Sequence, residues 1–461
     1  MSKTIKHWHF KGLLQKDKWY IPAYLGTDIT GRITYISDQK LEAVKTDEYV
    51  DGYAIPAFQN AHAHAFQYAM AGTAERHTTA DDFWSWREKM YSLALNISPE
   101  ELEAIAAMLY SEMLRHGYTQ VAEFHYLHHD LEGRPYSNLA EMGARLVAAA
   151  AQVGIGITLI PVFYQKGGFG QAASPRQRRF LSATSDDYLR LWEATQEVCK
   201  SYDRAKMGVG IHSLRAVDQA HLLRSLAQVP PQFPIHIHVA EQLKEISDSL
   251  AFYGQRPVEW LLNHVELSSH WQLVHATHLT DAEVSGIAQS AAQVVICPST
   301  EGNLGDGRFR LKEFQSQGGK WCIGTDSHIG LSPMEELRIL DYGQRIHLHQ
   351  RNIFHSSTQT DSGLYGFQQA LQAGRRAMGH QQADYFEMGH AFDAVVIDAK
   401  SPLIASSKVE HILSTLIYAG DPSFLLGTLT AGKWKVKDQH HIDEQSIRTR
   451  FYVSIKDLGN R

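Results

Sequence analysis

The chain has 461 residues, and its 44 basic and 50 acidic side chains give a formal net charge of −6. Without an excess of positive charge, strong non-specific binding to nucleic acids is not expected. Hydrophobic residues make up 44% of the chain and charged residues 20%, which is typical of folded globular proteins and excludes disorder as the main state. The length suits one large barrel plus a smaller domain.

Histidine and cysteine usage narrows the expected chemistry. The chain contains 26 histidines, more than its 20 tyrosines, and histidine is the commonest metal ligand. The three cysteines lie far apart without a CxxC pair, which argues against a disulfide framework or a thiolate metal site. The first residues lack the apolar core of a signal peptide, and no stretch reads as a membrane span. We therefore expect a cytoplasmic protein that binds neither membranes nor nucleic acid.

Both ends of the chain contain short strand-like runs. Near the N-terminus these are Trp19–Leu25 and Ile33–Ile36. Near the C-terminus, Phe392–Asp398 predicts a strand and Leu426–Val436 predicts a hairpin. Two β-rich ends around a long middle predict one small β-sandwich domain built from residues 1–53 and 390–461.

Residues 54–389 alternate short apolar runs with helical patterns, as parallel βα units do. Eight such units predict an α/β fold of the (β/α)₈, or TIM-barrel, type. The expected strands are Ala54–Gln59, Gln120–Phe124, Ile155–Val162, Met207–Ile211, Ile235–Val239, Gln272–Val274, Gln293–Cys297 and Trp321–Gly324.

Potential metal ligands lie at or just beyond the ends of three of these strands. His62 and His64 stand two residues apart, so their imidazoles point to the same face of a strand and can converge on one ion. Such a pair is often structural, but His238 adds a third nitrogen and Asp326 a carboxylate from two further strands. For Asp326 taken alone, the structural alternatives are capping of a helix or a buried ion pair. Together the four residues predict a catalytic zinc site with one position left for water.

Two further histidines lie next to this predicted site. His236 precedes His238 by two residues, so strand periodicity cannot separate them, and we favour His238 because it lies nearer the strand's end. His275 follows the sixth strand and either ligates the metal or hydrogen-bonds the bound water. His328 lies close enough to Asp326 to support it from behind.

Five segments carry a resemblance to a known family. The spacing of the predicted ligands resembles the amidohydrolase superfamily, and the segments narrow the match to its formimidoylglutamate deiminases. They are FQNAHAHAFQ (58–67), FWSWR (83–87), EFHY (123–126), HSLR (212–215) and PSTEGNLGDG (298–307). The chain departs from the family at Ala63, where members usually have Ser, and at Tyr68, where they often have Arg.

The resemblance implies a homodimeric hydrolase of histidine degradation. It would convert N-formimino-L-glutamate to N-formyl-L-glutamate and ammonia, by attack of a zinc-bound hydroxide on the formimino carbon. Zinc lowers the pKa of bound water from about 15.7 to near 7. Members with two metals carry a lysine after strand four, where this chain has His212, so we expect one Zn²⁺ per subunit.

Roles for individual residues follow from the resemblance and from position. Asp326 would accept the water proton, His275 would orient the attacking oxygen, and Glu241 would protonate the departing nitrogen as a general acid. The alternative for Glu241 is an N-cap or an acid in the first turn of the next helix. The expected substrate-binding residues are Gln67, Arg87, Tyr126, His212 and Arg215.

Arginine suits a substrate with two carboxylates, because its guanidinium binds each in a bidentate manner. Arg87 would serve one end of the substrate, in its own or a neighbouring subunit, or else it packs on the nearby tryptophans as a surface residue. An alternative function is deamination of a purine or related ring, for which we would expect aromatic slots and amides in place of arginines. A second alternative is a non-catalytic protein that kept the barrel fold, and such a protein should lack some of the predicted metal ligands.

Overall fold

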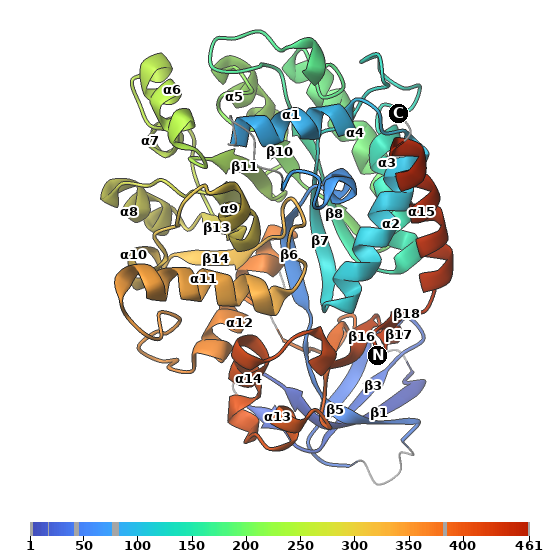
Figure 1. The fold of residues 1–461 in the computed structure, drawn as a ribbon. Helices are drawn as coiled ribbons and strands as arrows, with labels where there is room; N and C mark the ends of the chain where they lie inside the picture. Colours follow the sequence, from blue (N-terminus) through green and yellow to red (C-terminus); the bar gives the residue numbers. More distant parts are fainter. Residues whose placement is uncertain (1–2, 17, 41–45, 76–82, 381–384, 460–461) are drawn as a thin grey trace.

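The computed structural model describes residues 3–16, 18–40, 46–75, 83–380 and 385–459. It contains two sheets, one formed by the middle of the chain and one by strands from both ends (Figure 1). Both sheets bury extensive apolar surface: a large core fills and surrounds the first, and a smaller aromatic core covers the second.

The middle of the chain forms a parallel eight-stranded barrel with surrounding helices, which confirms the predicted fold class. Neighbouring strands pair in parallel and follow chain order around the sheet. The eight barrel strands are β6 (Phe58–Ala63), β7 (Tyr118–His125), β8 (Gly156–Phe163), β10 (Val209–Ile211), β11 (Ile235–Val239), β12 (Trp271–His275), β13 (Gln293–Ile296) and β14 (Lys320–Ile323). The short strand β9 (Ala205–Met207), which directly precedes β10, pairs in addition with the first half of β8.

The predicted first strand, Ala54–Gln59, is wrong in its bounds. Its first half ends β5 (Glu48–Pro56), which pairs with the terminal sheet, and the barrel strand β6 starts only at Phe58. The continuous apolar run hides this change of sheet, because both strands are buried there. As a result, His62 lies within β6 and not beyond a strand end. The division of the chain into residues 1–53 with 390–461 and residues 54–389 stays a prediction.

Helices cover the outside of the barrel, and local signals set their ends. Ser98 and Glu101 form a capping box at the start of α2, and Gly154 ends α3 with a left-handed φ of 85° before β8. The longer helices of this part are α1 (Phe83–Ala94), α2 (Pro99–Arg115), α3 (Glu141–Val153), α4 (Ser185–Cys199), α5 (Gln219–Gln228), α6 (Leu243–Tyr253), α7 (Pro257–His264), α8 (Asp281–Ser290), α11 (Pro333–Leu348) and α12 (Ser362–Ala377).

Short helical turns complete the connections. Within the barrel region they are η1 (Ala65–Met70), η2 (Pro175–Gln177), α9 (Pro298–Leu304) and α10 (Leu311–Ser316). Near the C-terminus the helical segments are α13 (Pro402–Ala405), η3 (Val409–His411), α14 (Ile412–Ala419), η4 (Pro422–Phe424) and α15 (Glu444–Gly459). Among the residues that the structure describes, no helix has both the length and the apolar character needed to cross a bilayer.

Strands from both ends of the chain form the second sheet, as predicted. Trp8 on β1 reaches Trp434 on β17 with ring centroids 6.4 Å apart, although other strands separate them in the sheet. The sheet therefore curls around its aromatic core, and Figure 1 shows its blue and red strands together. Its strands are β1 (Lys6–Leu14), β2 (Trp19–Tyr20), β3 (Ala23–Thr27), β4 (Ile33–Ser37), β5, β15 (Ala394–Asp398), β16 (Leu425–Thr430), β17 (Lys433–Lys437) and β18 (His440–His441).

Hydrogen bonds between β6 and the residues after β14 close the barrel. The backbone N–H groups of Thr325 and Asp326 donate to the carbonyl of His62 at 3.1 and 3.0 Å, and His64 N–H donates to the Asp326 carbonyl at 3.2 Å. The Asn60 amide adds two bonds to Thr325, at 2.7 and 3.0 Å. This seam brings the first and last barrel strands together at the position of the predicted ligands His62, His64 and Asp326.

A largely buried ion pair links the barrel to the terminal sheet. Arg204 donates to both carboxylate oxygens of Asp393, at 3.1 and 2.7 Å, and Ala431 N–H donates to the same carboxylate at 2.8 Å. Burial opposes ionisation of Asp393, but Arg204 outweighs it and holds the Asp393 pKa below its ordinary value of 3.8. The helix α15 also runs along α2, so the C-terminal end of the chain returns to the barrel (Figure 1).

We expect Asp393→Asn to lower the free energy of unfolding by about 3 kcal/mol at pH 7, because it leaves Arg204 buried without its charge partner. Since folding lowers the Asp393 pKa, the ionised pair stabilises above pH 3.8, and the stabilisation is lost as the pH falls through the folded-state pKa. The difference between variant and parent should therefore shrink only below about pH 4. Urea unfolding measures this difference in the free energy of unfolding.

Glu197→Gln, which breaks an exposed pair with Lys200, is the control and should change stability by less than about 0.5 kcal/mol. Equal shifts in both variants would contradict the prediction.

Candidate active site

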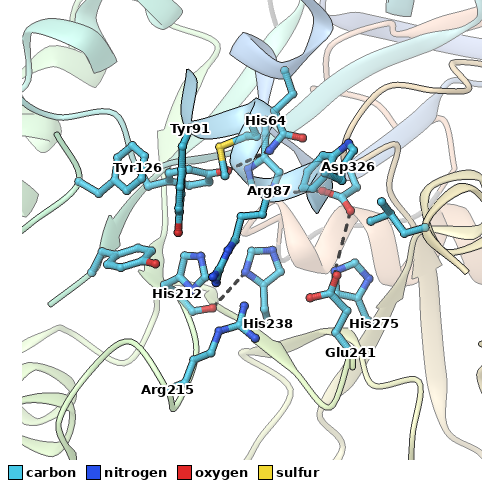
Figure 2. A pocket seen from close by; sticks show the side chains of 16 residues that line it. His64, Arg87, Tyr91, Tyr126, His212, Arg215, His238, Glu241, His275 and Asp326 are labelled. Atoms are coloured by element: carbon cyan, nitrogen blue, oxygen red, sulfur yellow. Dashed lines mark hydrogen bonds and ion pairs between the residues drawn. The ribbon is translucent and has the colours of Figure 1, made fainter. Parts of the chain in front are cut away.

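One pocket opens at the carboxyl ends of the barrel strands (Figure 2). The space between its lining atoms, open solvent included, is about 540 Å³. His62 lies beneath it, fully buried. All other residues predicted for the site line this pocket: His64, Gln67, Arg87, Tyr126, His212, Arg215, His238, Glu241, His275 and Asp326.

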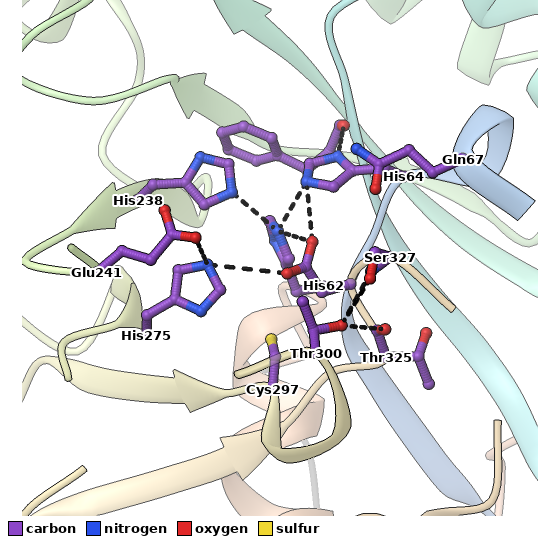
Figure 3. A network of polar contacts seen from close by, with 12 residues as sticks. His62, His64, Gln67, His238, Glu241, His275, Cys297, Thr300, Thr325 and Ser327 are labelled. Carbon is purple, nitrogen blue, oxygen red and sulfur yellow. Dashed lines mark hydrogen bonds and ion pairs between the residues drawn. The ribbon is translucent and has the colours of Figure 1, made fainter. Parts of the chain in front are cut away.

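Three imidazoles and one carboxylate converge at the floor of the pocket (Figure 3). The Nε2 atom of His62 lies 3.1 Å from Nε2 of His64 and 3.0 Å from Nε2 of His238. Oδ1 of Asp326 lies 3.2 Å from the His64 nitrogen and 3.6 Å from the His62 nitrogen. The hydrogen bonds that close the barrel thus bring His62 and His64 next to Asp326. The third imidazole, His238, comes from β11.

Backbone carbonyls fix the orientation of two of these rings. Nδ1 of His64 lies 2.8 Å from the carbonyl of Phe124, and Nδ1 of His238 lies 3.0 Å from the carbonyl of His212. A carbonyl only accepts, so each Nδ1 carries the hydrogen and each Nε2 directs a lone pair at the cluster. Burial is the main cause that lowers the pKa of His62 to about 3 and keeps the pKa of His238 well below its ordinary value. Neutral rings of this kind are metal ligands.

The donor set fits a metal ion. Ligand bonds of about 2.1 Å in a tetrahedral site place neighbouring donors about 3.4 Å apart, close to the separations observed here. Nitrogen lone pairs and a carboxylate packed this closely repel one another unless a cation lies among them. The chain offers His62, His64 and His238 as one group within ligand distance, and Asp326 as an adjoining oxygen donor. These residues can therefore hold one divalent metal.

The structure separates His236 from His238. The side chain of His236 is buried lower in the barrel, where its Nε2 lies 2.9 Å from the carbonyl of Ala377 at the end of α12. It therefore contacts a helix end and does not join the imidazole cluster. His328 lies beside the site, with its Nδ1 3.0 Å from Oγ1 of Thr325.

The backbone is strained at several strand exits around the pocket. Asp326 has a φ of 46°, His275 a φ of 69° and Ala240, two residues after His238, a φ of 54°. Non-glycine residues rarely adopt such values, at a cost of about 1–3 kcal/mol each. Two of these three residues, His275 and Asp326, line the pocket with their polar side chains, so part of the strain lies within the site.

A network of acids surrounds His275. Its Nδ1 lies 3.2 Å from Oε1 of Glu301, whose same oxygen accepts the backbone N–H of Cys297 at 2.9 Å. Its Nε2 then faces Glu241 and Asp326, each 3.9 Å away. Burial opposes a charge on His275, but the surrounding carboxylates outweigh it and raise the His275 pKa to about 10. Burial also raises the pKa of Glu241, against the opposing effects of His275 and Arg215.

Glu241 does not serve as a helix cap. The helix α6 begins at Leu243, and the acid in its first turn is Glu245, which accepts the backbone N–H of Glu241 at 3.1 Å. This bond holds the turn so that the Glu241 side chain lines the pocket beside His275 (Figure 2). The alternative role that the sequence left open for Glu241 is therefore excluded.

Positive charge gathers on the opposite side of the pocket. Arg215 is buried, and Arg87 on α1 reaches into the pocket of its own chain (Figure 2). Burial lowers the pKa of His212, and the charges of Arg215 and Arg87 lower it further, so both guanidinium groups act at this ring. Gln67 donates to the hydroxyl of Tyr126 at 2.9 Å between the two sides. The arrangement can bind an anionic group a few ångströms from the metal donors.

Several residues near the site have structural roles. His128 and His129 each bond through Nε2 to a backbone carbonyl, of Val162 at 3.0 Å and of Leu181 at 2.7 Å. Tyr68, where the family often has arginine, packs on Phe451 of α15 with ring centroids 5.8 Å apart and is not among the residues that line the pocket.

Sequence reasoning missed part of the pocket wall. Tyr164 directly follows β8, so the strand-end rule that found the other residues would have found it as well. Tyr91 lines the pocket from α1. Gln177 on η2 does not line the pocket but bonds to Tyr91 and Tyr164, which do, and neither Tyr91 nor Gln177 is marked by a strand end. Glu301 belongs to a recognised segment, but its contact with His275 depends on the turn of α9.

The comparisons agree with the fold and the site. The model of the amidohydrolase family matches residues 53–434, so the chain belongs to the amidohydrolase family. It is 42% identical over 413 residues to a formimidoylglutamate deiminase from Pseudomonas aeruginosa, covering 89% of this chain and 90% of the relative. The resemblance drawn from the five segments is thereby confirmed. Family and relative together make the chain a hydrolase that acts on C–N bonds.

More distant relatives share the architecture. The chain is 24% identical to a 5-methylthioadenosine/S-adenosylhomocysteine deaminase from Haloarcula marismortui, covering 87% of this chain and 85% of the relative. A solved amidohydrolase from Brucella melitensis superposes with a TM-score of 0.92 at 39% identity, covering 98% of this chain and all of the other. An adenosine deaminase from Xanthomonas campestris with bound zinc, at 20% identity and a TM-score of 0.82 over the full length of both chains, shows the fold alone.

We expect His238→Ala to lose the bound metal, because it removes one of three converging nitrogens. The matched control is His236→Ala, two residues earlier on the same strand, whose ring faces Ala377 and should be dispensable for metal. Elemental analysis of the purified proteins measures metal per chain. Metal loss in the His236 variant with retention in the His238 variant would reverse the ligand assignment. Circular dichroism of both variants establishes that each is folded.

Proposed function

We propose that this chain hydrolyses N-formimino-L-glutamate to N-formyl-L-glutamate and ammonia, as a step in histidine degradation. The observation that carries the proposal is the division of the pocket into two sides. One side holds the imidazole–carboxylate cluster with Glu241, and the other holds Arg87 and Arg215. The substrate has a matching division, with a cationic amidine at one end and two carboxylates along the rest. The formimidoylglutamate deiminase at 42% identity supports the same reaction.

The substrate-binding residues match the charges of this molecule. Arg87 and Arg215 offer bidentate hydrogen bonds to carboxylates, with His212 beside them. Gln67 donates through its nitrogen to Tyr126, and its Oε1 is buried with no hydrogen-bond partner in the described part of the chain. An unpartnered buried acceptor is costly, and an N–H of the formimino group would satisfy it. Gln67 thus holds the amidine between the two sides of the pocket.

A divalent metal held by His62, His64, His238 and Asp326 supplies the acidity that makes water nucleophilic near neutral pH. Side chains of the protein carry out the proton transfers. Asp326 accepts a proton from the attacking water, and His275, held by Glu301, orients the water oxygen toward the formimino carbon.

Glu241 completes the reaction by proton transfer to the leaving nitrogen. The water oxygen forms a new bond to the formimino carbon, and the terminal C–N bond of that carbon then breaks. Glu241 lies between His275 and the substrate side of the pocket, so its carboxyl group can protonate the departing amine, which leaves as ammonia. The product retains the oxygen as its formyl group.

A second candidate function is deamination of a purine or a related ring. The 5-methylthioadenosine/S-adenosylhomocysteine deaminases among the relatives favour it, but at 24% identity. Two arginines in the pocket argue against it, because a neutral ring offers no carboxylate to offset their desolvation. A barrel without activity is disfavoured because every proposed ligand and Glu241 are present.

Further features belong to the same proposal. Three histidines and a carboxylate suit zinc, and one ion per subunit is consistent with a fourth barrel strand that is followed by His212 and not by lysine. We further propose a homodimeric enzyme of the cytoplasm, in line with its small-molecule chemistry and its family resemblance.

The test is ammonia release from N-formimino-L-glutamate, with guanine and adenosine as competing substrates. We expect turnover of formiminoglutamate alone, and its loss after chelation with recovery on adding zinc. Ammonia from a purine but not from formiminoglutamate would favour the second candidate. No ammonia from any of them, in protein that contains metal, would contradict both.

Glu241→Gln tests the proton-transfer role. We expect kcat to fall by about 100-fold or more, since positioned general acids contribute roughly this much, while the metal content stays at the parental value. Elemental analysis and steady-state kinetics are measured on the same preparation. Glu266→Gln, an exposed carboxylate beyond α7, serves as the control and should leave both unchanged. Loss of the metal in Glu241→Gln would instead assign this residue to the metal cluster.

A further inference from the structure

The wall of the pocket beside the arginines comes from two segments outside the barrel sheet. One is the helix α1, which contributes Tyr91, and the other is the segment after β8, which contributes Tyr164. Gln177, at the end of η2, lies buried between them. Arg179, two residues further on, donates to the carbonyl of Ile97 at 2.8 Å and to that of Ala94 at the end of α1. The two segments are therefore bound into one rigid wall.

The amide of Gln177 has a defined orientation. Its Oε1 accepts the backbone N–H of Ser174 at 2.8 Å, and this contact requires oxygen because the backbone group can only donate. The Nε2 must then face the pocket wall, where it lies 2.6 Å from the hydroxyl of Tyr164 and 3.1 Å from that of Tyr91. Both amide hydrogens are thus donated to phenol oxygens.

This orientation makes the two phenols donors. Each phenol oxygen already accepts a hydrogen from Gln177, which has no acceptor left to offer in return. The hydroxyls of Tyr164 and Tyr91 also interact with each other, and a bond between them uses one phenol hydrogen. The other phenol hydrogen has no acceptor within the cluster. Figure 2 shows Tyr91 pointing its hydroxyl into the pocket, near His212.

The surroundings of these hydroxyls suit an anion. The charges of Arg215 and Arg87 both act on the Tyr164 phenol, and Tyr164 and Tyr91 both act on Arg215. The ring of Tyr164 lies against His212 with centroids 4.3 Å apart. A phenol donor beside two guanidinium groups forms a composite site for a carboxylate, because all its groups present hydrogens.

We propose that Tyr91 and Tyr164 donate a hydrogen bond to one carboxylate of the substrate, and that Gln177 is a positioning residue that sets these phenols as donors. The identity of the anion as a substrate carboxylate rests on the proposed function. The tyrosine pair would then select dicarboxylic substrates together with the two arginines, while the chemistry at the metal side is unaffected.

Two substitutions at Gln177 separate this role from a purely structural one. Gln177→Glu keeps the shape and still accepts the Ser174 N–H, but its second oxygen accepts the phenol hydrogens and draws them away from the substrate. Gln177→Leu removes the amide bonds yet leaves the phenols free to donate. We expect KM for formiminoglutamate to rise about tenfold or more in the Glu variant, less in the Leu variant, with kcat within twofold in both.

The opposite order would overturn the proposal. A structural role predicts greater damage from Leu, which breaks the bond to the Ser174 N–H and alters the packing, than from the isosteric Glu. Tyr91→Phe should raise KM about tenfold, whereas Tyr188→Phe, which also removes a buried hydroxyl but lies outside the pocket, should leave KM unchanged. A fall in kcat with constant KM, or equal effects of the two Tyr→Phe variants, would also refute it. Thermal unfolding checks that each variant is folded.

Substrate analogues identify the carboxylate. Formimino derivatives of 4-aminobutyrate and 2-aminobutyrate lack the α- and the γ-carboxylate respectively. The effect of Gln177→Glu on KM should vanish with one of them and persist with the other. An effect of equal size on both analogues and on the full substrate would mean that no carboxylate contacts the tyrosines.

A binding measurement keeps this proposal separate from the proposed function. Glutarate carries two carboxylates but no formimino group, and calorimetry of the metal-loaded protein measures its affinity directly. We expect binding to the parent and at least tenfold weaker binding to Gln177→Glu. If the parent fails to release ammonia from formiminoglutamate, the proposed function fails, yet this result still decides whether the tyrosine pair holds a carboxylate. Equal glutarate affinity in both proteins would overturn the inference.

Discussion

The hydrogen-bonded seam between the first and last barrel strands is the constraint on which the site depends. A parallel sheet that closes on itself must join its two edges, and here the joint lies at the carbonyl of His62, which accepts from Thr325 and Asp326. Asn60 ties the same two segments with its side chain. The bonds that close the barrel are therefore also the bonds that bring the histidine pair to the aspartate. A shift of either strand by one residue would turn the ligands to the opposite face.

Once the seam is set, burial divides the pocket electrostatically. The imidazoles of His62 and His238 are kept neutral because charging them without solvent is costly, so their lone pairs stay available to a metal. The acids around His275 have the opposite effect, because their charges outweigh the cost of burial there. Arg87 and Arg215 line the pocket on the far side, where they add positive potential. A substrate with unlike charges at its two ends can enter such a pocket in only one orientation.

The sequence was sufficient for the part of the site that strand geometry dictates. Alternation along β11 puts His236 and His238 on the same face of the strand. The two differ only in their depth in the barrel, and the contact of His236 with Ala377 shows that His236 lies deeper. The strand predicted from the apolar run Ala54–Gln59 had wrong bounds, because β5 and β6 are both buried there and an apolar pattern cannot show that the chain passes from one sheet to the other. Tyr91 and Gln177 could not be found from the sequence, since a helix and a short turn place them through contacts distant along the chain.

This difference in predictability has a physical basis. Residues at strand ends are positioned by backbone ladders, so a shift in the register of one strand would move the closure of the barrel and the metal donors together. The wall formed by α1 and η2 is attached differently, through the side chains of Gln177 and Arg179. Such an attachment can be rebuilt with other side chains at small cost to the sheet. The barrel can therefore keep one hydrolytic centre while the attached wall determines which molecule is presented to it. In this chain that wall presents phenol hydrogens beside guanidinium groups, a surface suited to carboxylates and poorly suited to a neutral ring.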